Sequence, residues 1–261
     1  RMFGYLPMAN YLVMQPERIN AGSFLDLYKQ RRDLHPVYNN YTRITGPRAH
    51  EDLEPILRPL FTTSFLIDDW LADNDFFGAK QVISISASSK TGLGLGFGLS
   101  RRQAAPAAIG LTSKGNKAFV ESTGYFDKTV TYDDVTSLDA SIPTAVVDFA
   151  GNGEVLSAVH HHFRDNLVES TTVGLSHKDA PRATGNLPGA KPHLFFAPDQ
   201  MKKRNEEWGN EAYDRKVGES WDAFATSAGK WMKLERSRGE AAITKVYSDM
   251  LSGRINPAEG H

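Results

Sequence analysis

Short apolar runs alternate with helix-like stretches through the middle of the chain. The runs are rich in β-branched and small apolar residues and are bounded by turn-forming residues, as is typical of buried strands. We expect six strands, at residues 80–86, 106–113, 128–132, 143–151, 169–176 and 191–198. Helical patterns fall between them at residues 94–102, 116–123 and 153–166. Strands that alternate with helices predict parallel βαβ units and therefore an α/β fold with a doubly wound sheet.

The segments on either side of this region are predicted to be helical. Apolar residues recur at helical spacing over residues 51–71, and Pro59 interrupts that pattern, so we expect two helices that meet near Thr62. Residues 199–250 combine many charges with scattered aromatic side chains, which predicts amphipathic helices packed on the sheet. The aromatic residues expected at that contact are Trp208, Trp221, Phe224 and Trp231.

Composition and charge narrow the class of protein. The 261 residues are 40% hydrophobic and 23% charged, which is ordinary globular usage and disfavours fibrous and disordered classes. A formal net charge of -1 gives no overall attraction to nucleic acid or to an anionic membrane. Cysteine is absent, which excludes disulfides and thiolate zinc sites and favours the cytoplasm. No apolar stretch of about 18 residues predicts a membrane span. Because the sequence begins with Arg1 and not Met, we expect that an N-terminal portion precedes it.

The strongest local motif lies at residues 81–98, where a predicted strand leads into a turn of small residues and then a helix. This is the form of a phosphate site, because free backbone N–H groups at a helix start face the anion. Side-chain donors would be added by Ser86, Ser88, Ser89, Lys90 and Thr91. The alternative is a structural turn whose close helix–sheet packing needs Gly92, Gly94, Gly96 and Gly98. A P-loop is excluded, because Ser89 stands where its glycine would precede the lysine.

A second motif follows the second predicted strand. It presents Ser113, Lys114 and Lys117 at the point where a dinucleotide fold carries an acidic residue for the ribose 2′-hydroxyl. Hydroxyl and basic groups instead accommodate a 2′-phosphate, so the motif favours NADP(H) over NAD(H). The alternative is that these lysines are solvated side chains on a surface loop.

The order of these motifs resembles a known family. The stretches ISASSKTGLG, IGLTSKGNKAF, ESTGYFDKTVTYDD, AVVDFAGNG and TTVGLS are similar to the cofactor domain of medium-chain dehydrogenase/reductases, in the zinc-free quinone oxidoreductase-like branch. PLFTTSFLIDDWLADNDFFGA, SASSKTGLG and LFFAPDQMKKR resemble, more narrowly, a subfamily that carries a domain of unknown function. The resemblance implies a Rossmann-like doubly wound parallel sheet with remnants of a GroES-like catalytic domain at the termini. It divides the chain into the end of that domain with a linker (1–50), a dinucleotide-binding domain (51–198) and C-terminal helices that return to the catalytic domain (199–261).

The resemblance also implies which residues hold the cofactor and a partner subunit. The glycine-rich turn of the family falls on residues 88–92, and we hypothesise that Lys90 adds a salt contact to the pyrophosphate. The 2′-phosphate contacts fall on Ser113, Lys117 and Tyr132. The nicotinamide would lie against Gly151, Asn152, Val173 and Gly174. Pairing through the last strand of the sheet implies a homodimer with an interface near Leu194, Phe195 and Phe196.

Other residues are weighed for catalysis. Tyr38 and Tyr41 lie in VYNNYTR, where a residue of an interdomain cleft could donate a proton; the alternative is a polar linker with packed tyrosines. Asp68 and Asp69 are expected to be solvated or to cap a helix. Three histidines occupy residues 160–162, and because neighbouring side chains on a helix diverge by about 100°, we expect them to face water and to bind no metal.

Three functions remain open at this point. The first is a zinc-independent, NADP(H)-dependent oxidoreductase that transfers hydride between nicotinamide and a carbonyl, quinone or activated double bond. The second is a non-catalytic NADPH-binding sensor or interaction module, which the replacement of family glycines by Ser89 and Lys90 suggests. The third is a single-stranded nucleic acid binder using Arg101, Arg102 and the basic residues 202–204, which the near-neutral charge disfavours. We expect a small-molecule substrate and no nucleic acid or membrane partner.

Overall fold

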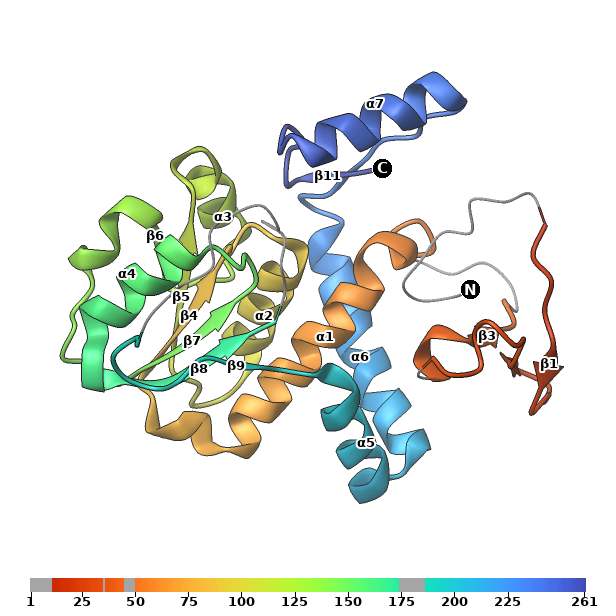
Figure 1. Cartoon of the computed structure of the whole chain (residues 1–261), viewed down its shortest axis with the longest axis horizontal. Helices are drawn as coiled ribbons and strands as arrows, with labels where there is room; N and C mark the ends of the chain where they lie inside the picture. Colours follow the sequence, from red (N-terminus) through yellow and green to blue (C-terminus); the bar gives the residue numbers. More distant parts are fainter. Residues whose placement is uncertain (1–10, 35, 45–49, 174–185) are drawn as a thin grey trace. The chain divides into compact units, whose positions relative to one another are not determined.

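Figure 1 shows the computed structural model of the chain, which describes residues 11–34, 36–44, 50–173 and 186–261. The chain divides into two compact units, Arg1–Pro55 and Ile56–His261. Each unit is defined by contacts among its own residues.

The first unit contains a small antiparallel sheet. Strand β1 (Pro16–Glu17) pairs with β2 (Ser23–Asp26), and β2 pairs with β3 (Asn40–Thr42). Phe24 and Tyr41 are partners in the register, and their rings stack with a centroid separation of 5.0 Å. The buried carboxylate of Asp26 binds the guanidinium of Arg31 and accepts the backbone N–H of Gln15 at 2.9 Å. These contacts hold the short strands in register.

The second unit is organised by a parallel sheet of six strands. They are β4 (Gln81–Ile85), β5 (Ala107–Thr112), β6 (Lys128–Thr131), β7 (Thr144–Asp148), β8 (Leu167–Thr172) and β9 (His193–Leu194). Their order across the sheet is β6-β5-β4-β7-β8-β9, and every adjacent pair is parallel. The chain therefore winds outward from β4 in one direction and from β7 in the other. This confirms the predicted α/β fold with a doubly wound sheet.

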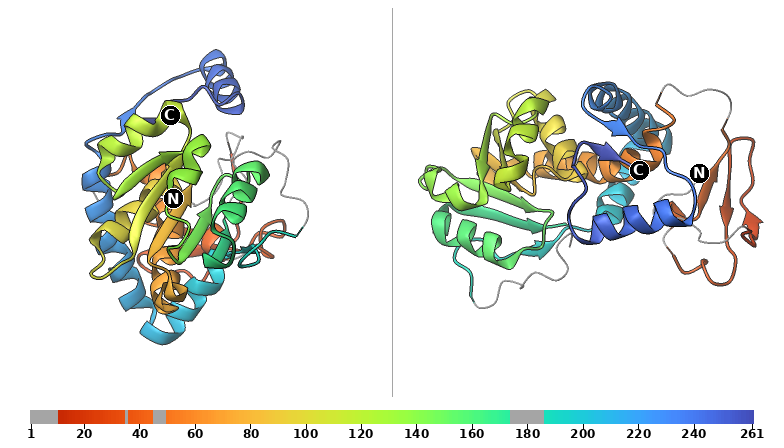
Figure 2. Two further views of the ribbon diagram at one scale, coloured as in Figure 1. Left: turned by 90° about the vertical axis from the view of Figure 1, so that its left-hand side faces the viewer. Right: turned by 90° about the horizontal axis from the view of Figure 1, so that it is seen from above.

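Helices cover both faces of this sheet, as Figure 2 shows. One face carries α1 (Glu54–Asp73), α2 (Lys90–Arg101) and α3 (Lys117–Thr123), and the other carries α4 (Gly153–Phe163). Successive residues of a strand point to opposite faces. Val82 accordingly joins the core under α1 and α2, whereas Ile83 joins the core under α4 with Leu156 and Phe163.

Helix α1 is one continuous helix, so the predicted break near Thr62 is wrong. Pro59 lies early in the helix, where its missing N–H removes a single intrahelical hydrogen bond. The apolar stripe continues past it through the fully buried side chains of Phe61, Leu66 and Leu71. Burial of this stripe outweighs the loss of one backbone hydrogen bond.

The C-terminal region adds α5 (Ala197–Trp208), α6 (Asn210–Ala228) and α7 (Glu240–Leu251), with short parallel strands β10 (Lys233–Leu234) and β11 (Glu259–Gly260). Phe224 of α6 is fully buried and stacks on Phe61 of α1 at 4.6 Å, with Phe97 of α2 at 5.3 Å. Helix α6 therefore lies on α1 and α2, which in turn cover the sheet (Figure 1). Within the part of the chain that the structure describes, no helix is long and apolar enough to cross a membrane.

Candidate functional site

The carboxyl ends of β4 to β8 meet at one edge of the sheet, and the turn after β4 lies at its centre. Ser86 follows β4 with a positive φ of 66°. Ser89 then caps α2, because its hydroxyl accepts the Gly92 N–H at 3.0 Å while its own N–H donates to the Ser86 carbonyl at 2.8 Å. A Cβ at Gly92 would lie 2.7 Å from that carbonyl oxygen, so glycine is required for the close approach.

This turn leaves backbone donors at the start of α2. Among the described residues, the N–H groups of Lys90 and Thr91 have no acceptor, and they lie at the positive end of the helix dipole. The turn can therefore receive an anionic oxygen. The Ser89 hydroxyl already accepts the N–H of Gly92. A glycine at position 89 would leave that N–H free, so the turn has one free donor fewer than it would have with glycine there.

Lys90 does not point its charge into open solvent. Its ammonium group donates to the backbone carbonyl of Glu259 in β11 at 3.0 Å. Burial lowers the pKa of Lys90, and the nearby carboxylate of Glu259 opposes that effect. The hypothesised salt contact to a pyrophosphate thus competes with an existing contact of the same group.

Hydrogen bonds tie the turn after β4 to the loop after β5. The Ser88 hydroxyl lies 3.2 Å from the hydroxyl of Thr112 and 3.0 Å from the amide nitrogen of Asn116. Thr112 is fully buried at the end of β5. Sequence analysis missed Thr112 and Asn116, because hydroxyl and amide residues at strand ends carry no distinctive spacing.

The loop after β5 carries the three residues expected to favour NADP(H). Ser113 precedes a short 3-10 helix that contains Lys114, and Lys117 opens α3. The Lys117 ammonium forms an ion pair with Glu121 one turn later, and 38% of its side chain is exposed. The structure brings this basic loop beside the turn after β4, as the adjacent strands require.

Tyr132 lies in the same edge, after β6. Its hydroxyl lies near Ser86. Burial is the main cause that raises the pKa of Tyr132, and the charge of the Asp148 carboxylate at the end of β7 raises it further, so the phenol stays protonated at neutral pH. The sequence predicts Ser86 only as a side-chain donor. It does not predict the structural role of Ser86, because the positive φ of this residue becomes visible only in the folded turn.

The loops after β7 and β8 complete the edge. The Asp148 carboxylate accepts the backbone N–H groups of Ala150 at 2.8 Å and Gly151 at 3.1 Å, and Gly151 has a positive φ of 68°. The Asn152 side chain caps α4 by accepting the N–H groups of Glu154 and Val155. The Val173 N–H donates to the Asp148 carbonyl at 2.9 Å. Gly174 lies outside the described residues.

The tyrosines proposed for catalysis belong to the first unit. Tyr41 stacks on Phe24, which fits a packed tyrosine, and 37% of Tyr38 is exposed. The edge of the sheet belongs to the second unit.

Asp68 and Asp69 are neither solvated nor helix caps, contrary to expectation. Both are buried and they face different partners. Asp68 binds the guanidinium of Arg102 through two oxygens, at 3.1 and 2.6 Å. Asp69 binds Arg204 at 2.6 Å and Gln200 at 2.7 Å. These pairs join helices and stand apart from the strand ends.

The expectation that the three histidines face water is wrong for His160, which is fully buried. Its ring lies 2.8 Å from the Pro188 carbonyl and 2.9 Å from the Ser170 hydroxyl. His161 is exposed, and His162 donates to the Leu138 carbonyl at 2.9 Å. Among the described residues, no cluster of three or more histidine or acidic side chains could hold a metal ion.

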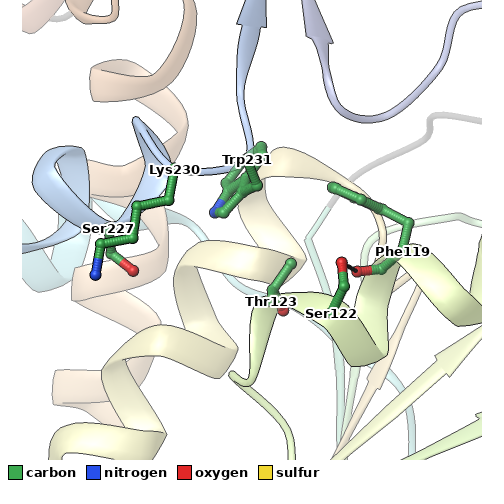
Figure 3. Close-up of a pocket in the computed structure, with 6 residues that line it drawn as sticks. All are labelled: Phe119, Ser122, Thr123, Ser227, Lys230 and Trp231. Carbon is green, nitrogen blue, oxygen red and sulfur yellow. Dashed lines mark hydrogen bonds between the residues drawn. The ribbon is translucent and has the colours of Figure 1, made fainter.

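A groove of about 480 Å³ lies between α3 and the end of α6 (Figure 3). Trp231 and Phe119 form its aromatic wall at a centroid separation of 5.6 Å, and the Lys230 ammonium points away from them (Figure 3). The Ser122 hydroxyl is already bonded to the Phe119 carbonyl at 2.7 Å. The groove lies on the helical layer and contains none of the residues of the sheet edge.

Comparison with solved structures finds the same fold in chains of low sequence identity. CurA from Vibrio vulnificus in complex with NADPH is 14% identical, with a TM-score of 0.56 over 90% of this chain and 72% of that chain. The yhdH oxidoreductase from Salmonella enterica in complex with NADP is 12% identical, with a TM-score of 0.53 over 89% and 77%. Bacillus subtilis yhfP with NAD bound is 13% identical, with a TM-score of 0.53 over 83% and 64%, so this chain spans less than two thirds of its length. None of the curated proteins compared is a significant match.

The sheet order and the turn after β4 define the class of protein. It is an α/β protein with a Rossmann-like fold, and the solved structures that share this fold include an oxidoreductase in complex with NADP. The chain belongs to the family described as "Protein of unknown function (DUF2855)", which matches residues 1–256.

Proposed function

We propose that this protein is a zinc-independent, NADP(H)-dependent oxidoreductase of the medium-chain dehydrogenase/reductase type. Hydride would pass between the nicotinamide and a carbonyl, a quinone or an activated double bond, and the cofactor would supply this redox chemistry when bound. The observation that carries the proposal is the basic loop after β5, with Ser113, Lys114 and Lys117, adjoining an anion-receiving turn at the start of α2.

The residues at the sheet edge fit such a cofactor. Gly92 permits the close backbone approach that the phosphate turn needs, and the N–H groups of Lys90 and Thr91 would receive the pyrophosphate. No acidic residue stands in the loop 112–117 to bind a ribose 2′-hydroxyl, so the basic side chains would receive a 2′-phosphate. Other residues of the sheet edge would line the rest of the cofactor site: Ser88, Ser89, Tyr132, Gly151, Asn152 and Val173.

Of the three solved structures described above, two contain NADPH or NADP and one contains NAD, so the cofactor preference is tested directly. We would titrate the protein with NADPH and NADH and follow cofactor fluorescence. Lys117→Ala should weaken NADPH binding by about 10-fold to 150-fold, because a charge-assisted hydrogen bond contributes about 1.5–3 kcal/mol, and should leave NADH binding unchanged. Lys202→Ala, a lysine on α5 that is 75% exposed, is the matched control. Equal weakening of both cofactors would contradict a 2′-phosphate role for Lys117.

A non-catalytic NADPH-binding sensor is the second candidate, and the capping of the turn by Ser89 favours it. This hydroxyl fills a donor position that a glycine would leave to the cofactor. The two candidates separate in one assay, in which NADPH oxidation is measured with a panel of quinones, enones and aldehydes. Turnover of any acceptor supports the oxidoreductase, and tight binding without turnover supports the sensor.

Tyr38 and Tyr41 are proposed proton donors, and Tyr41→Phe should lower turnover without changing NADPH affinity.

We also propose that two copies pair through the sheet edge at β9. Leu194 and Phe196 are 68% and 52% exposed there, whereas Phe195 is buried against Trp70 at 5.4 Å. The contact would therefore be made by Leu194 and Phe196, with Phe195 as part of the core behind them. Light scattering should give a dimer, and Leu194→Asp with Phe196→Asp should give a monomer. A monomeric wild-type protein at micromolar concentration would refute the pairing.

A further inference from the structure

The last strand of the chain is fastened to the turn that begins α2. Lys90, the first residue of α2, donates its ammonium to the Glu259 carbonyl at 3.0 Å, although the two residues are 169 positions apart. Strand β11 also pairs in parallel with β10, where the Lys233 N–H donates to the Ala258 carbonyl and the Glu235 N–H to the Gly260 carbonyl, both at 2.8 Å. β10 and β11 thus form a two-stranded ribbon, here called the C-terminal ribbon, beside the phosphate-type turn.

A second contact fixes the ribbon independently of Lys90. Gly260 is buried, and a Cβ there would lie 2.8 Å from Ile56 Cδ1 and 3.4 Å from both Leu234 Cδ2 and Met232 Sδ. The backbone of β11 therefore packs tightly against the start of α1. Two contacts thus fix β11: the hydrogen bond from Lys90 to the Glu259 carbonyl, and the close packing of Gly260 against Ile56.

We propose that Lys90 is a positioning residue that anchors the C-terminal ribbon against the phosphate turn, so that the ribbon forms an additional wall of the dinucleotide site. The proposal deepens the proposed function and rests on it for the identity of the ligand. The claim that Lys90 anchors the C-terminal ribbon rests only on contacts within the chain and does not depend on the ligand. If the docked ribbon completes the dinucleotide site, docking favours dinucleotide binding, and linkage then requires that dinucleotide binding favour docking by the same factor.

The proposal assigns Lys90 a different role from that of a pyrophosphate ligand, and two variants separate the roles. Lys90→Met removes the ammonium and keeps much of the side-chain volume. Gly260→Val leaves Lys90 intact and adds a branched side chain where a Cβ alone would already lie 2.8 Å from Ile56 Cδ1, so we expect it to displace β11. If Lys90 acts through the ribbon, both variants should have the same effect on dinucleotide binding. If Lys90 binds phosphate directly, only Lys90→Met should weaken it. Lys80→Met, an exposed lysine at the opposite end of β4, is the matched control.

The first measurement is amide hydrogen exchange without cofactor, which tests anchoring whether or not the protein binds NADPH. We expect the Lys233 and Glu235 amides to exchange at least about tenfold faster in Lys90→Met and in Gly260→Val, because local opening breaks their hydrogen bonds. Exchange in Lys80→Met, and in the α4 amides of every variant, should match wild type. Lys90→Arg, which restores a donor, should restore protection. Unchanged exchange in Lys90→Met would overturn the anchor.

The second measurement is NADPH affinity. We expect both variants to bind about tenfold more weakly than wild type, and NADPH to slow exchange at Lys233 and Glu235 in wild type. Weakening in Lys90→Met alone would overturn the wall and identify Lys90 as a direct ligand. If wild type binds no dinucleotide, the proposed function fails and the wall with it, while the exchange data still decide the anchor. Should Gly260→Val not fold by circular dichroism, Gly260→Ala replaces it.

Discussion

The imidazole Nε2 of His160 lies 2.9 Å from the hydroxyl oxygen of Ser170, and this contact joins the last turn of α4 to the buried strand β8. The other ring nitrogen lies 2.8 Å from the Pro188 carbonyl, which can only accept a hydrogen bond. The network therefore assigns the proton to Nδ1 and leaves Nε2 to accept from Ser170.

Stability should fall with decreasing pH because of this histidine. Burial is the main cause that lowers the pKa of His160 below its ordinary value of 6.5, so below about pH 6.5 the unfolded chain binds a proton that the folded chain does not. The free energy of unfolding therefore decreases from about pH 7.5 to about pH 5.5. Urea unfolding at both values should show a smaller decrease for His160→Gln than for wild type. His161→Gln, at the exposed neighbour, should behave as wild type, and identical pH dependence in all three proteins would contradict the prediction.

Loss of the Arg204 guanidinium should destabilise the second unit. Arg204 binds Asp69 at 2.6 Å and Asp73 at 2.9 Å, and its side chain is 9% exposed. Arg204→Met leaves the buried Asp69 carboxylate without its cation, which should cost about 3 kcal/mol of unfolding free energy. Lys203→Met is the control, because the Lys203 side chain is 47% exposed and a surface pair contributes at most about 1 kcal/mol. Chemical unfolding measures the loss of unfolding free energy in each variant. Equal losses in Arg204→Met and Lys203→Met would show that burial of the ion pair does not determine the destabilisation.

Two glycines in helices should respond to alanine with opposite signs. A Cβ at Gly96 of α2 would lie 2.6 Å from the ring of Phe126, so Gly96→Ala should overpack the core and cost about 1–3 kcal/mol. At Gly218 of α6 a Cβ meets nothing within 4 Å, so Gly218→Ala should gain about 0.5–1 kcal/mol from helix propensity alone. Thermal unfolding of the two variants gives the comparison. A stabilised Gly96→Ala would mean that Phe126 moves aside at little cost.

The cap of α2 should be measurable in the same way. Ser89→Ala removes the acceptor of the Gly92 N–H and should cost about 1 kcal/mol, whereas Ser89→Gly should cost only a few tenths. If the capped N–H also lies on the path of a dinucleotide, Ser89→Gly should bind NADPH more tightly than wild type. Calorimetric titration tests this last point, and weaker binding by Ser89→Gly would place the Ser89 hydroxyl among the cofactor contacts.

The strands and their parallel, doubly wound arrangement could be predicted because the information is local. Each run such as residues 80–86 or 143–151 carries its own β-branched pattern, and the helical stretches between them require parallel crossovers. Phosphate-turn residues such as Gly92 also follow from local spacing. Where the local pattern misled, as at Pro59, the burial of a long apolar stripe decided the outcome.

The sequence by itself thus determined the fold class, the strands and the loops that meet at the candidate site. The tertiary structure alone decided which polar side chains are buried and what they bind. Asp69 meets Arg204 across 135 residues, and Lys90 meets Glu259 across 169. Such pairings depend on how helices and strands pack after they form, and the free energy of burying a charge is set by the partner it finds there. Periodicity within one segment contains no information about that partner.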